Sequence, residues 1–218
     1  MEAVHAESEL NTEVARAHDN NNATTTEANC PVFVAFDIGL KNLAACAIDS
    51  TGTIYAWRRM PLMDEQRKTK PAQDVLMEAL FEHLDELVEE LAGKNLIVLI
   101  ENQPSRINGG MKTIQVWIQT YFALRRHWGE SVLSVHLVSP SQKLVGHTHA
   151  TTGATGTGYK FNKTAAIVLT RAYFAEGAAP KWYAEFTTCK KKDDLADALL
   201  HAIAWMRRQG LMVEYVLD

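Results

Sequence analysis

The sequence predicts an α/β protein in which a mixed sheet of five strands is flanked by helices. Three observations support this fold class. Short apolar runs rich in branched and aromatic residues are followed by longer segments with helical periodicity. The first three such runs follow one another closely, whereas helical segments separate the later ones. The 218 residues suit one main domain, and an apolar content of 47% is ample for its core.

A meander of three antiparallel strands is expected within residues 32–60. Residues 32–39 form an apolar, β-branched and aromatic run that ends in an acid and a glycine. A second run at 41–49 leads through the turn 50–52 into a third strand at 53–58. The turn is made of serine, threonine and glycine, and together with the strand-like flanks it favours antiparallel pairing.

Helices and strands alternate through the rest of the chain. Pro71 opens a segment whose apolar residues recur at helical spacing until Gly93, and a continuous apolar strand follows at 95–101. The remaining expected elements are a loop, a helix, a fifth strand and two further helices, at residues 102–110, 111–127, 132–138, about 162–176 and about 192–208. This order of strands and helices describes a mixed five-stranded sheet flanked by helices.

Residues 1–30 differ in composition from residues 31–218, and we expect them to be a disordered acidic leader before the folded domain. The leader holds six acids and one arginine, whereas the rest of the chain holds 21 basic and 20 acidic residues. It has too few periodic apolar residues to pack. It also lacks the apolar core of a secretory signal, and its acids argue against a mitochondrial transit peptide. No apolar stretch in the chain approaches the roughly 18 residues of a membrane span.

Cysteine spacing and a Gly/Thr-rich stretch argue against several kinds of site. The three cysteines have no CxxC spacing, which argues against a disulfide framework or a zinc site and suits a reducing compartment. Residues 146–158 contain four glycines and five threonines and are expected to be mobile. They lack the Gly-Lys-Ser/Thr end of a P-loop, so no nucleotide cofactor is expected. His147 and His149 within them are expected to be ordinary polar residues.

Four acids stand where a metal site would need them. Asp37 and Glu101 end two apolar strands, and in open α/β sheets ligands collect beyond the strand ends. Asp194 and Asp197 are three positions apart on one face of the last expected helix, with Cβ atoms about 5–6 Å apart. Like charges this close repel one another unless divalent cations lie between them. The alternative for the helical pair is a solvated helix start, which the macrodipole favours.

The arrangement of these acids resembles a known family. The residues that carry the resemblance are Asp37-x-Gly39-x-x-Asn42, Ile100-Glu101 and Asp194-x-x-Asp197-Ala198. They resemble the RuvC-like Holliday junction resolvases of the ribonuclease H-like superfamily, over residues 32 to about 208. A narrower resemblance is carried by residues 100–106, Met111-Lys112-x-Ile114-Gln115 and residues 191–194. It points to the branch found in poxviruses and other large DNA viruses.

The resemblance implies a metal-dependent endodeoxyribonuclease of DNA recombination and repair. It implies a homodimer that binds four-way and other branched DNA junctions and resolves them by paired symmetric nicks, leaving 5′-phosphate and 3′-hydroxyl ends. Asp37, Glu101, Asp194 and Asp197 would hold two Mg²⁺ ions per active site, with Mn²⁺ able to substitute. Lys143 and Lys163 would be the active-site lysines, with Lys160 as the alternative to Lys163.

DNA contacts are expected from basic residues near this site. They are Arg106, Lys112, Lys143, Lys160, Lys163, Lys191 and Lys192. Each of these residues is equally compatible with a solvated surface cation, and phosphate contacts would make binding weaken steeply with salt. Tyr159 is expected to stack against unstacked bases at the branch point.

Several alternatives stay open at this stage. The same fold could serve a ribonuclease H-like nuclease acting on hybrids or ends, or a catalytically inactive junction-binding module. The helix at 111–127 is apolar around much of its circumference, which suits either a dimer seam or deep burial. The expected location is intracellular at the site of DNA replication, which is the virus factory in the host cytoplasm if the chain is viral. Mitochondrial and nuclear locations are the alternatives, and secretion and membrane association are not expected.

Overall fold

The structure is a computed structural model that describes residues 30–64, 66–104, 109–144, 158–175 and 179–211. The acidic leader and most of the Gly/Thr-rich stretch lie outside these residues, so the expectations for them stay predictions. None of the described helices combines the length and apolar character that a membrane crossing requires. All three cysteines lie within the described residues, and none of them forms a disulfide.

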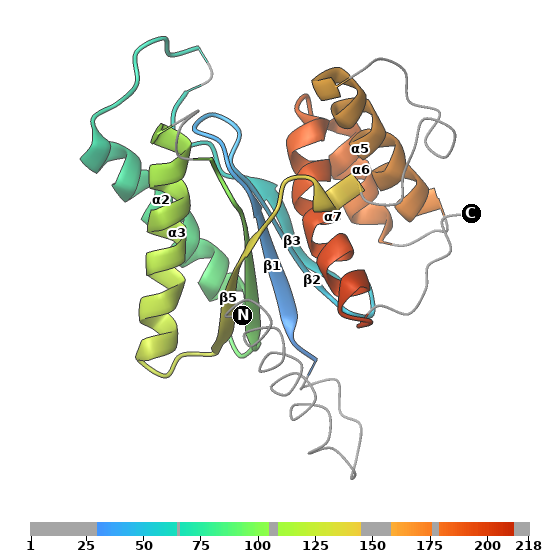
Figure 1. The fold of residues 1–218 in the computed structure, drawn as a ribbon, viewed down its shortest axis with the longest axis horizontal. Coiled ribbons are helices and arrows are strands. Elements are labelled where there is room, and N and C mark those ends of the chain that lie inside the picture. Colours follow the sequence, from blue (N-terminus) through green and yellow to red (C-terminus); the bar gives the residue numbers. More distant parts are fainter. Residues whose placement is uncertain (1–29, 65, 105–108, 145–157, 176–178, 212–218) are drawn as a thin grey trace. The chain divides into compact units, whose positions relative to one another are not determined.

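Five strands form one sheet in the order β3-β2-β1-β4-β5 (Figure 1). Their bounds are Val32–Asp37 for β1, Ala44–Asp49 for β2, Ile54–Arg59 for β3, Leu96–Glu101 for β4 and Val132–Val138 for β5. The first three strands pair antiparallel, whereas β1 pairs parallel with β4, and β4 with β5. The predicted fold class, a mixed five-stranded sheet flanked by helices, is confirmed.

Helices cover both faces of the sheet (Figure 1). They are α2 (Gln73–Glu90), α3 (Gly109–His127), α5 (Gly158–Ala175), α6 (Pro180–Thr188) and α7 (Lys192–Arg208), with a short 3-10 turn η2 (Gln142–Leu144) after β5. Helices α2 and α3 lie on one side of the sheet, and α5, α6 and α7 lie on the other. No helix was expected from the sequence where α6 lies, and α5 begins earlier than the start at about residue 162 that was expected for it.

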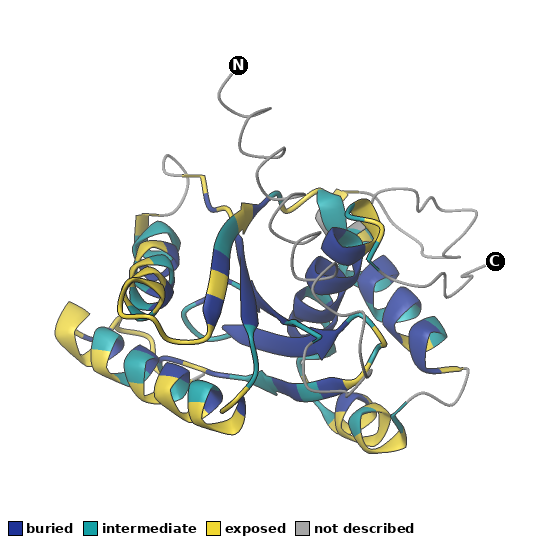
Figure 2. Cartoon of the chain, turned by 90° about the horizontal axis from the view of Figure 1, so that it is seen from below, coloured by how far each residue is buried: buried dark blue, intermediate teal, exposed yellow. Residues whose placement is uncertain are grey.

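The core between the sheet and helices α2 and α3 follows from periodicity. Leu76, Leu80, Leu84 and Leu87 recur at helical spacing and are buried against alternate residues of the strands, so that α2 presents one apolar stripe to the sheet. Each such side chain contributes about 1.5–3 kcal/mol by leaving water. Figure 2 shows the central strands buried, whereas the edge strands β3 and β5 are partly exposed.

The opposite face of the sheet is covered by α7. Strand side chains alternate between faces, so Phe33, Ala35 and Asp37 share the face opposite to that of Val34. Phe33 packs against Trp205 of α7 with ring centroids 5.5 Å apart. The indole Nε1 of Trp57 donates a 2.8 Å hydrogen bond to the carbonyl of Leu195 in the first turns of α7. The first contact holds the end of α7 over the start of β1, and the second holds the start of α7 over β3.

Asp49 is a buried acid with a structural role, and its carboxylate is fully hydrogen-bonded. Asp49 ends β2, and its Oδ1 accepts hydrogen bonds from Thr51 N, Thr51 Oγ1 and Thr53 N at 2.6–3.0 Å. Its Oδ2 accepts a 2.8 Å bond from the hydroxyl of Tyr55. The turn expected at 50–52 is therefore present, and Gly52 occupies it with a φ of 88° that a side chain would strain. Both oxygens of Asp49 are engaged by its own hairpin.

Candidate active site

Two carboxylates lie side by side where β1 and β4 end. The parallel register pairs Phe36 with Ile100, so Asp37 and Glu101 come next on the two neighbouring strands. Neighbouring strands lie about 4.8 Å apart, and the alternation of side chains places both acids on the α7 face. The sheet itself therefore holds this pair together, and Glu101 is buried.

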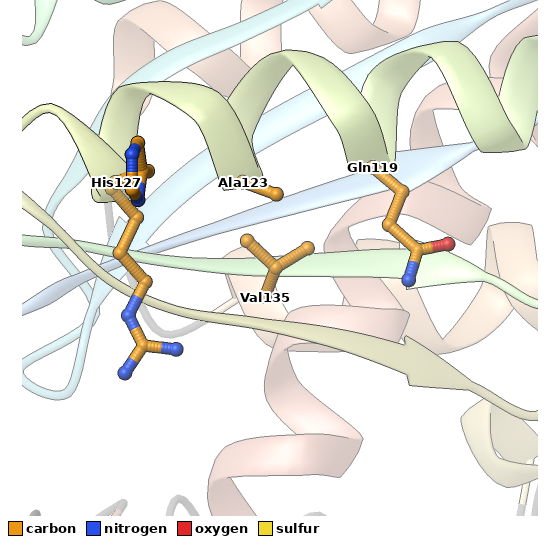
Figure 3. Close-up of a pocket in the computed structure, with 5 residues that line it drawn as sticks. Gln119, Ala123, His127 and Val135 are labelled. Carbon is orange, nitrogen blue, oxygen red and sulfur yellow. The ribbon is translucent and has the colours of Figure 1, made fainter.

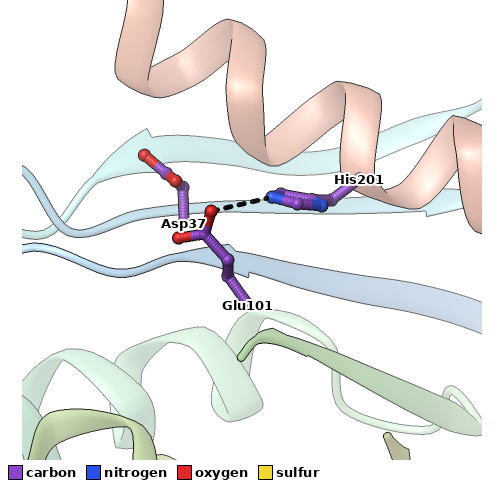
Figure 4. Close-up of side chains that lie close together, drawn as sticks. All are labelled: Asp37, Glu101 and His201. Carbon is purple, nitrogen blue, oxygen red and sulfur yellow. Dashed lines mark ion pairs between the residues drawn. The ribbon is translucent and has the colours of Figure 1, made fainter. Parts of the chain in front are cut away.

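Helix α7 contributes three further polar side chains to the site. Asp194, Asp197 and His201 are spaced by three and four residues, so they share one face of the helix. His201 is only 2% exposed, and its Nε2 lies 3.6 Å from Oε1 of Glu101 (Figure 4). One potential ligand atom each from Asp37, Glu101 and His201 lie within 4.8 Å of one another. Acids from two strands thus face a helix that carries two acids and an imidazole.

Lys143 is the cation in this cluster. It lies in η2, directly after β5, and its Nζ is 2.7 Å from Oδ2 of Asp197 and 3.9 Å from Oε1 of Glu101. Burial lowers the pKa of Lys143, but the charges of Asp197 and Asp37 outweigh it and hold the pKa above its ordinary value. The ammonium group therefore stays charged and offsets part of the negative charge of the site.

Lys163 lies beside the first turn of α7, where its charge lowers the pKa of Asp194 and so opposes the effect of burial. Its ammonium group pairs with Asp193, the residue before Asp194. The side chains of Lys160 and Tyr159 lie outside the described residues, although both belong to α5. Arg106 also lies outside them. The choice between Lys160 and Lys163 as second active-site lysine is therefore left open.

Polar side chains brace the loop that follows β4. The amide Nε2 of Gln103 donates a 2.6 Å hydrogen bond to Oε2 of Glu101. The backbone N–H of Gln103 donates a 2.7 Å bond to Oε1 of the buried Gln115. Lys112 donates to the side-chain oxygens of Gln115 and Asn102 at 3.1 and 3.3 Å. This chain of bonds from α3 fixes the orientation of the Glu101 carboxylate.

Two of the lysines expected to contact DNA are thus bound within the chain. Lys112 braces the loop after Glu101, and the Nζ of Lys192 donates a 2.8 Å bond to the carbonyl of Cys189. Lys191, at the start of α7, is half-buried, and its charge acts on Asp194. Lys112 and Lys192 were expected to contact DNA, and the sequence alone does not reveal that their ammonium groups bind oxygens of the chain itself.

Two residues of the site were missed from the sequence. His201 is one, and its position four residues after Asp197 was the available signal. Arg59 is the other, at the end of β3, with its Nε 3.9 Å from Oδ2 of Asp194. Its Nη2 donates to the carbonyl of Lys41 and to Oδ1 of Asn42, both at 3.1 Å. Two antiparallel steps bring the end of β3 to the same edge of the sheet as Asp37.

The acids repel one another in the metal-free protein. Burial raises the pKa of Asp37 well above its usual range, and the charges of Glu101 and Asp197 raise it further. Burial also raises the pKa of Asp197, although Lys143 opposes it. The pKa of Glu101 is raised by burial but is held below its ordinary value by His201 and Lys143. The raised pKa values of Asp37 and Asp197 show that Lys143 and Arg59 do not fully offset the negative charge of the site.

The donor atoms of the site fit a divalent cation. Among the described residues, Oδ2 of Asp194, Oδ1 of Asp197 and both ring nitrogens of His201 are buried without a hydrogen-bond partner. Buried polar atoms normally have one, as the carboxylate of Asp49 does. Carboxylate oxygens are the ligands that Mg²⁺ and Mn²⁺ take in proteins. The unpartnered atoms and the converging charge are what a metal centre requires.

Asp194 gives this site a testable pH dependence. Burial and the neighbouring Asp193 raise the pKa of Asp194 to about 6. A protonated carboxyl does not ligate a cation, so we expect the rise in Tm caused by Mn²⁺ to shrink as pH falls through about 6. Thermal unfolding with and without Mn²⁺ at pH 5 and pH 7.5 measures this difference.

The control for this pH dependence is the Asp194→Asn variant. It should show a smaller Mn²⁺ effect at pH 7.5 and a weaker pH dependence of that effect. Glu82→Gln, an exposed change on α2 across the sheet, should behave as the wild type. An equal Mn²⁺ effect in wild type and Asp194→Asn at both pH values would remove Asp194 from the ligand set.

One surface hollow lies away from the acids. A hollow of about 420 Å³ between α3 and β5 is lined by Gln119, Ala123, Arg126, His127 and Val135 (Figure 3). It lies on the α3 side of the sheet, whereas the acids face α7. No carboxylate lines it, and we assign it no part in the site.

Comparison with known proteins finds solved structures with a similar fold. No model of a known protein family matches the sequence, and neither does any curated protein. The yeast mitochondrial Holliday junction resolvase Ydc2 is similar in structure, at 19% identity and a TM-score of 0.51, over 84% of this chain and 80% of that one. Thermus thermophilus RuvC is similar at 14% identity and a TM-score of 0.48, over 81% of this chain and 96% of that one.

A second structure of Thermus thermophilus RuvC, in complex with a Holliday junction substrate, is similar at 13% identity and a TM-score of 0.47. It covers 82% of this chain and 96% of that one. At these identities the likeness concerns the fold. The chain therefore shares with the yeast structure a fold in which a mixed five-stranded sheet is flanked by helices.

Proposed function

We propose that this chain is a metal-dependent nuclease that resolves four-way DNA junctions. The observation that carries the proposal is the convergence of Asp37 and Glu101 from adjacent parallel strands on the acidic face of α7. Buried and mutually repelling acids are costly to fold unless they bind cations. The similar yeast structure is that of a Holliday junction resolvase, which supports this substrate over other nucleic acids.

The residues that would hold divalent cations are Asp37, Glu101, Asp194 and Asp197. When bound, such cations lower the pKa of a water molecule and offset the charge of a phosphodiester under attack. Gln103 holds the Glu101 carboxylate in one orientation through its 2.6 Å hydrogen bond. Lys143 keeps a positive charge at the same place, where it stabilises negative charge that develops on the phosphate. We propose 5′-phosphate and 3′-hydroxyl products.

The DNA would approach the edge of the sheet where β1 and β4 end. We propose phosphate contacts by Lys163 and Lys191 near the start of α7, and by Arg106 and Lys160, with Tyr159 stacking on bases. Lys112 and Lys192 are proposed instead to support the site, because their ammonium groups bind oxygens of the chain itself. Phosphate contacts of this kind would make binding weaken steeply with salt.

Paired nicks require two active sites, so we propose a homodimer. Ile114, Ile118 and Phe122 of α3 are buried in the core, and this accounts for much of the apolar character of that helix. Val116 and Leu124 of α3 are 45% and 43% exposed, which leaves apolar surface for a seam. We also propose the division into a leader of residues 1–30 and a domain of residues 31–218, and membership of the poxvirus and large-DNA-virus branch.

A junction-cutting assay tests the proposed function. The full chain would be incubated with Mg²⁺ and, separately, a labelled four-way junction, a duplex of the same sequence and an RNA–DNA hybrid. We expect symmetric nicks in the junction that ligase reseals, little cutting of the duplex, and none with chelator. Cutting of the hybrid but not the junction would favour a ribonuclease H-like activity. Junction binding without any cutting would favour an inactive binding module.

A further inference from the structure

His201 is a buried histidine whose ring nitrogens have no hydrogen-bond partner among the described residues. It lies on the face of α7 that carries Asp194 and Asp197, and its side chain is 1% exposed. Burying such polar atoms without partners costs about 1–3 kcal/mol each, and an apolar side chain would avoid this cost. The position therefore calls for an explanation beyond packing.

The imidazole points at the strand-end acids. Its Nε2 lies 3.6 Å from Oε1 of Glu101, just beyond hydrogen-bonding distance. Ligand atoms of Asp37, Glu101 and His201 come together within 4.8 Å (Figure 4). The charge of His201 also acts on the carboxylate of Asp197, which the ammonium of Lys143 approaches to 2.7 Å. A cation between the two strands would meet two carboxylates and one nitrogen.

We propose that His201 supplies a nitrogen ligand to a divalent cation held by Asp37 and Glu101, and that this ligand makes the site prefer Mn²⁺ to Mg²⁺. The inference rests on the proposed metal centre and adds to it a ligand and a selectivity. Mg²⁺ takes oxygen ligands and keeps several waters, so an imidazole nitrogen contributes little to its binding. First-row transition metals accept imidazole readily.

His136 provides a matched comparison. It lies on β5, and its Nε2 shares a 2.8 Å hydrogen bond with the hydroxyl of Ser134. Its ring packs against Trp205 with centroids 5.5 Å apart. Because this histidine has structural partners of its own and faces no acid cluster, replacing it should leave metal binding unchanged.

Mn²⁺ is the probe for the experiment. Metal-free full chain would be loaded with Mn²⁺ without DNA, and pulsed EPR would detect ¹⁴N coupling from a directly bound imidazole. We expect this coupling in the wild type and in His136→Gln, and its loss in His201→Gln. In titrations, His201→Gln should weaken Mn²⁺ binding about tenfold or more, by analogy with changes around other metal sites, and Mg²⁺ binding much less.

Three results would overturn the inference: no ¹⁴N coupling in the wild type, coupling that persists in His201→Gln, or equal losses of Mn²⁺ and Mg²⁺ affinity. The wild-type spectrum decides the first point even if the variant folds poorly. Junction cutting with Mg²⁺ is a separate measurement. Cutting without ¹⁴N coupling would remove only this inference, whereas ¹⁴N coupling without cutting would retain the ligand and remove the proposed function.

Discussion

Asp37→Asn should abolish metal-dependent cutting of a four-way junction and, at the same time, stabilise the metal-free protein. Asp37 ends the central strand β1, next to Glu101 in register. The charges of three acids, Glu101, Asp197 and Asp194, raise its pKa. An asparagine keeps the size of the side chain but removes the charge that holds a cation. We expect cutting to fall at least about 10³-fold, as when other enzymes lose an essential catalytic group, while junction binding is largely kept.

The rise in stability follows from the direction of the pKa shift. Burial, and then Glu101 and Asp197, raise the pKa of Asp37, so its ionised form is disfavoured in the folded state. Without metal, the folded protein therefore loses stability as pH rises from the ordinary range of an aspartate toward this raised pKa. The amide that replaces the carboxyl group cannot ionise, so the variant escapes this loss at neutral pH. Each kcal/mol regained would raise Tm by about 2–4 °C in a domain of this size.

Asp49→Asn is the matched control for Asp37→Asn. Asp49 also ends a strand and is buried, but its carboxylate accepts four hydrogen bonds within its own hairpin. Its replacement should lower Tm and leave cutting intact, which is opposite to the expectation for Asp37 on both counts. Melting curves in chelator at pH 7.5 and single-turnover cutting rates measure the two effects. Normal cutting by Asp37→Asn would disprove its role as a ligand.

The strand-borne half of the site could be predicted from sequence because strand ends are visible there. An acid that closes an apolar, β-branched run is conspicuous, and parallel strands bring their carboxyl ends to one edge. Asp37 and Glu101 satisfy both conditions. The structure places them on adjacent strands in the register that the pairing of β1 with β4 requires. The fold class followed from the same periodicities.

The helical half of the site could be predicted only in part. The spacing of Asp194 and Asp197 predicts that they share one face of α7. It does not predict which strand residues this face packs against. His201 was missed because a single histidine on an apolar helical face is usually a core residue. Lys163 was expected to be an active-site lysine, and the structure pairs its ammonium group with Asp193, the residue that precedes Asp194. A long side chain reaches either position, and only the packing of α5 on α7 decides between them.

Helix α6 was missed for a local reason. It has nine residues, too few for its apolar spacing to be distinguished from a loop. Its start has no side-chain cap, and Ala179 before it has a left-handed φ of 45°. Pro180 in the first turn was the available signal, because proline favours that position. Packing supplies the rest, since Phe186 of α6 stacks on Trp57 with ring centroids 5.3 Å apart.

Lys143→Met should have the second largest effect, through the charge balance of the same cluster. The ammonium group lies 2.7 Å from Asp197 and 3.9 Å from Glu101, where it faces the charge of a bound phosphate. Removing a preorganised electrostatic partner of this kind lowers catalytic rates about 10²–10³-fold. We expect a loss of this size in junction cutting at saturating Mg²⁺, measured under single-turnover conditions.

The same change should destabilise the metal-free protein. Burial lowers the pKa of Lys143, but Asp197 and Asp37 outweigh it, so the charged form is favoured by folding. The stability that this charge contributes is fully present below the unfolded pKa of lysine and is lost only as pH rises through the raised folded pKa. At pH 7.5, methionine therefore removes a stabilising charge from beside Asp197 and Glu101.

Divalent metal should then restore more stability to the variant than to the wild type. A cation bound by the acids replaces the missing positive charge, so the Mn²⁺-induced rise in Tm should be larger for Lys143→Met. Lys70→Met, a change at an exposed position, should match the wild type in both melting experiments. If Lys143→Met instead melted at the wild-type temperature in chelator and showed an unchanged response to Mn²⁺, the lysine would not be the counter-ion of the acid cluster. The loss of cutting would then need a cause other than charge.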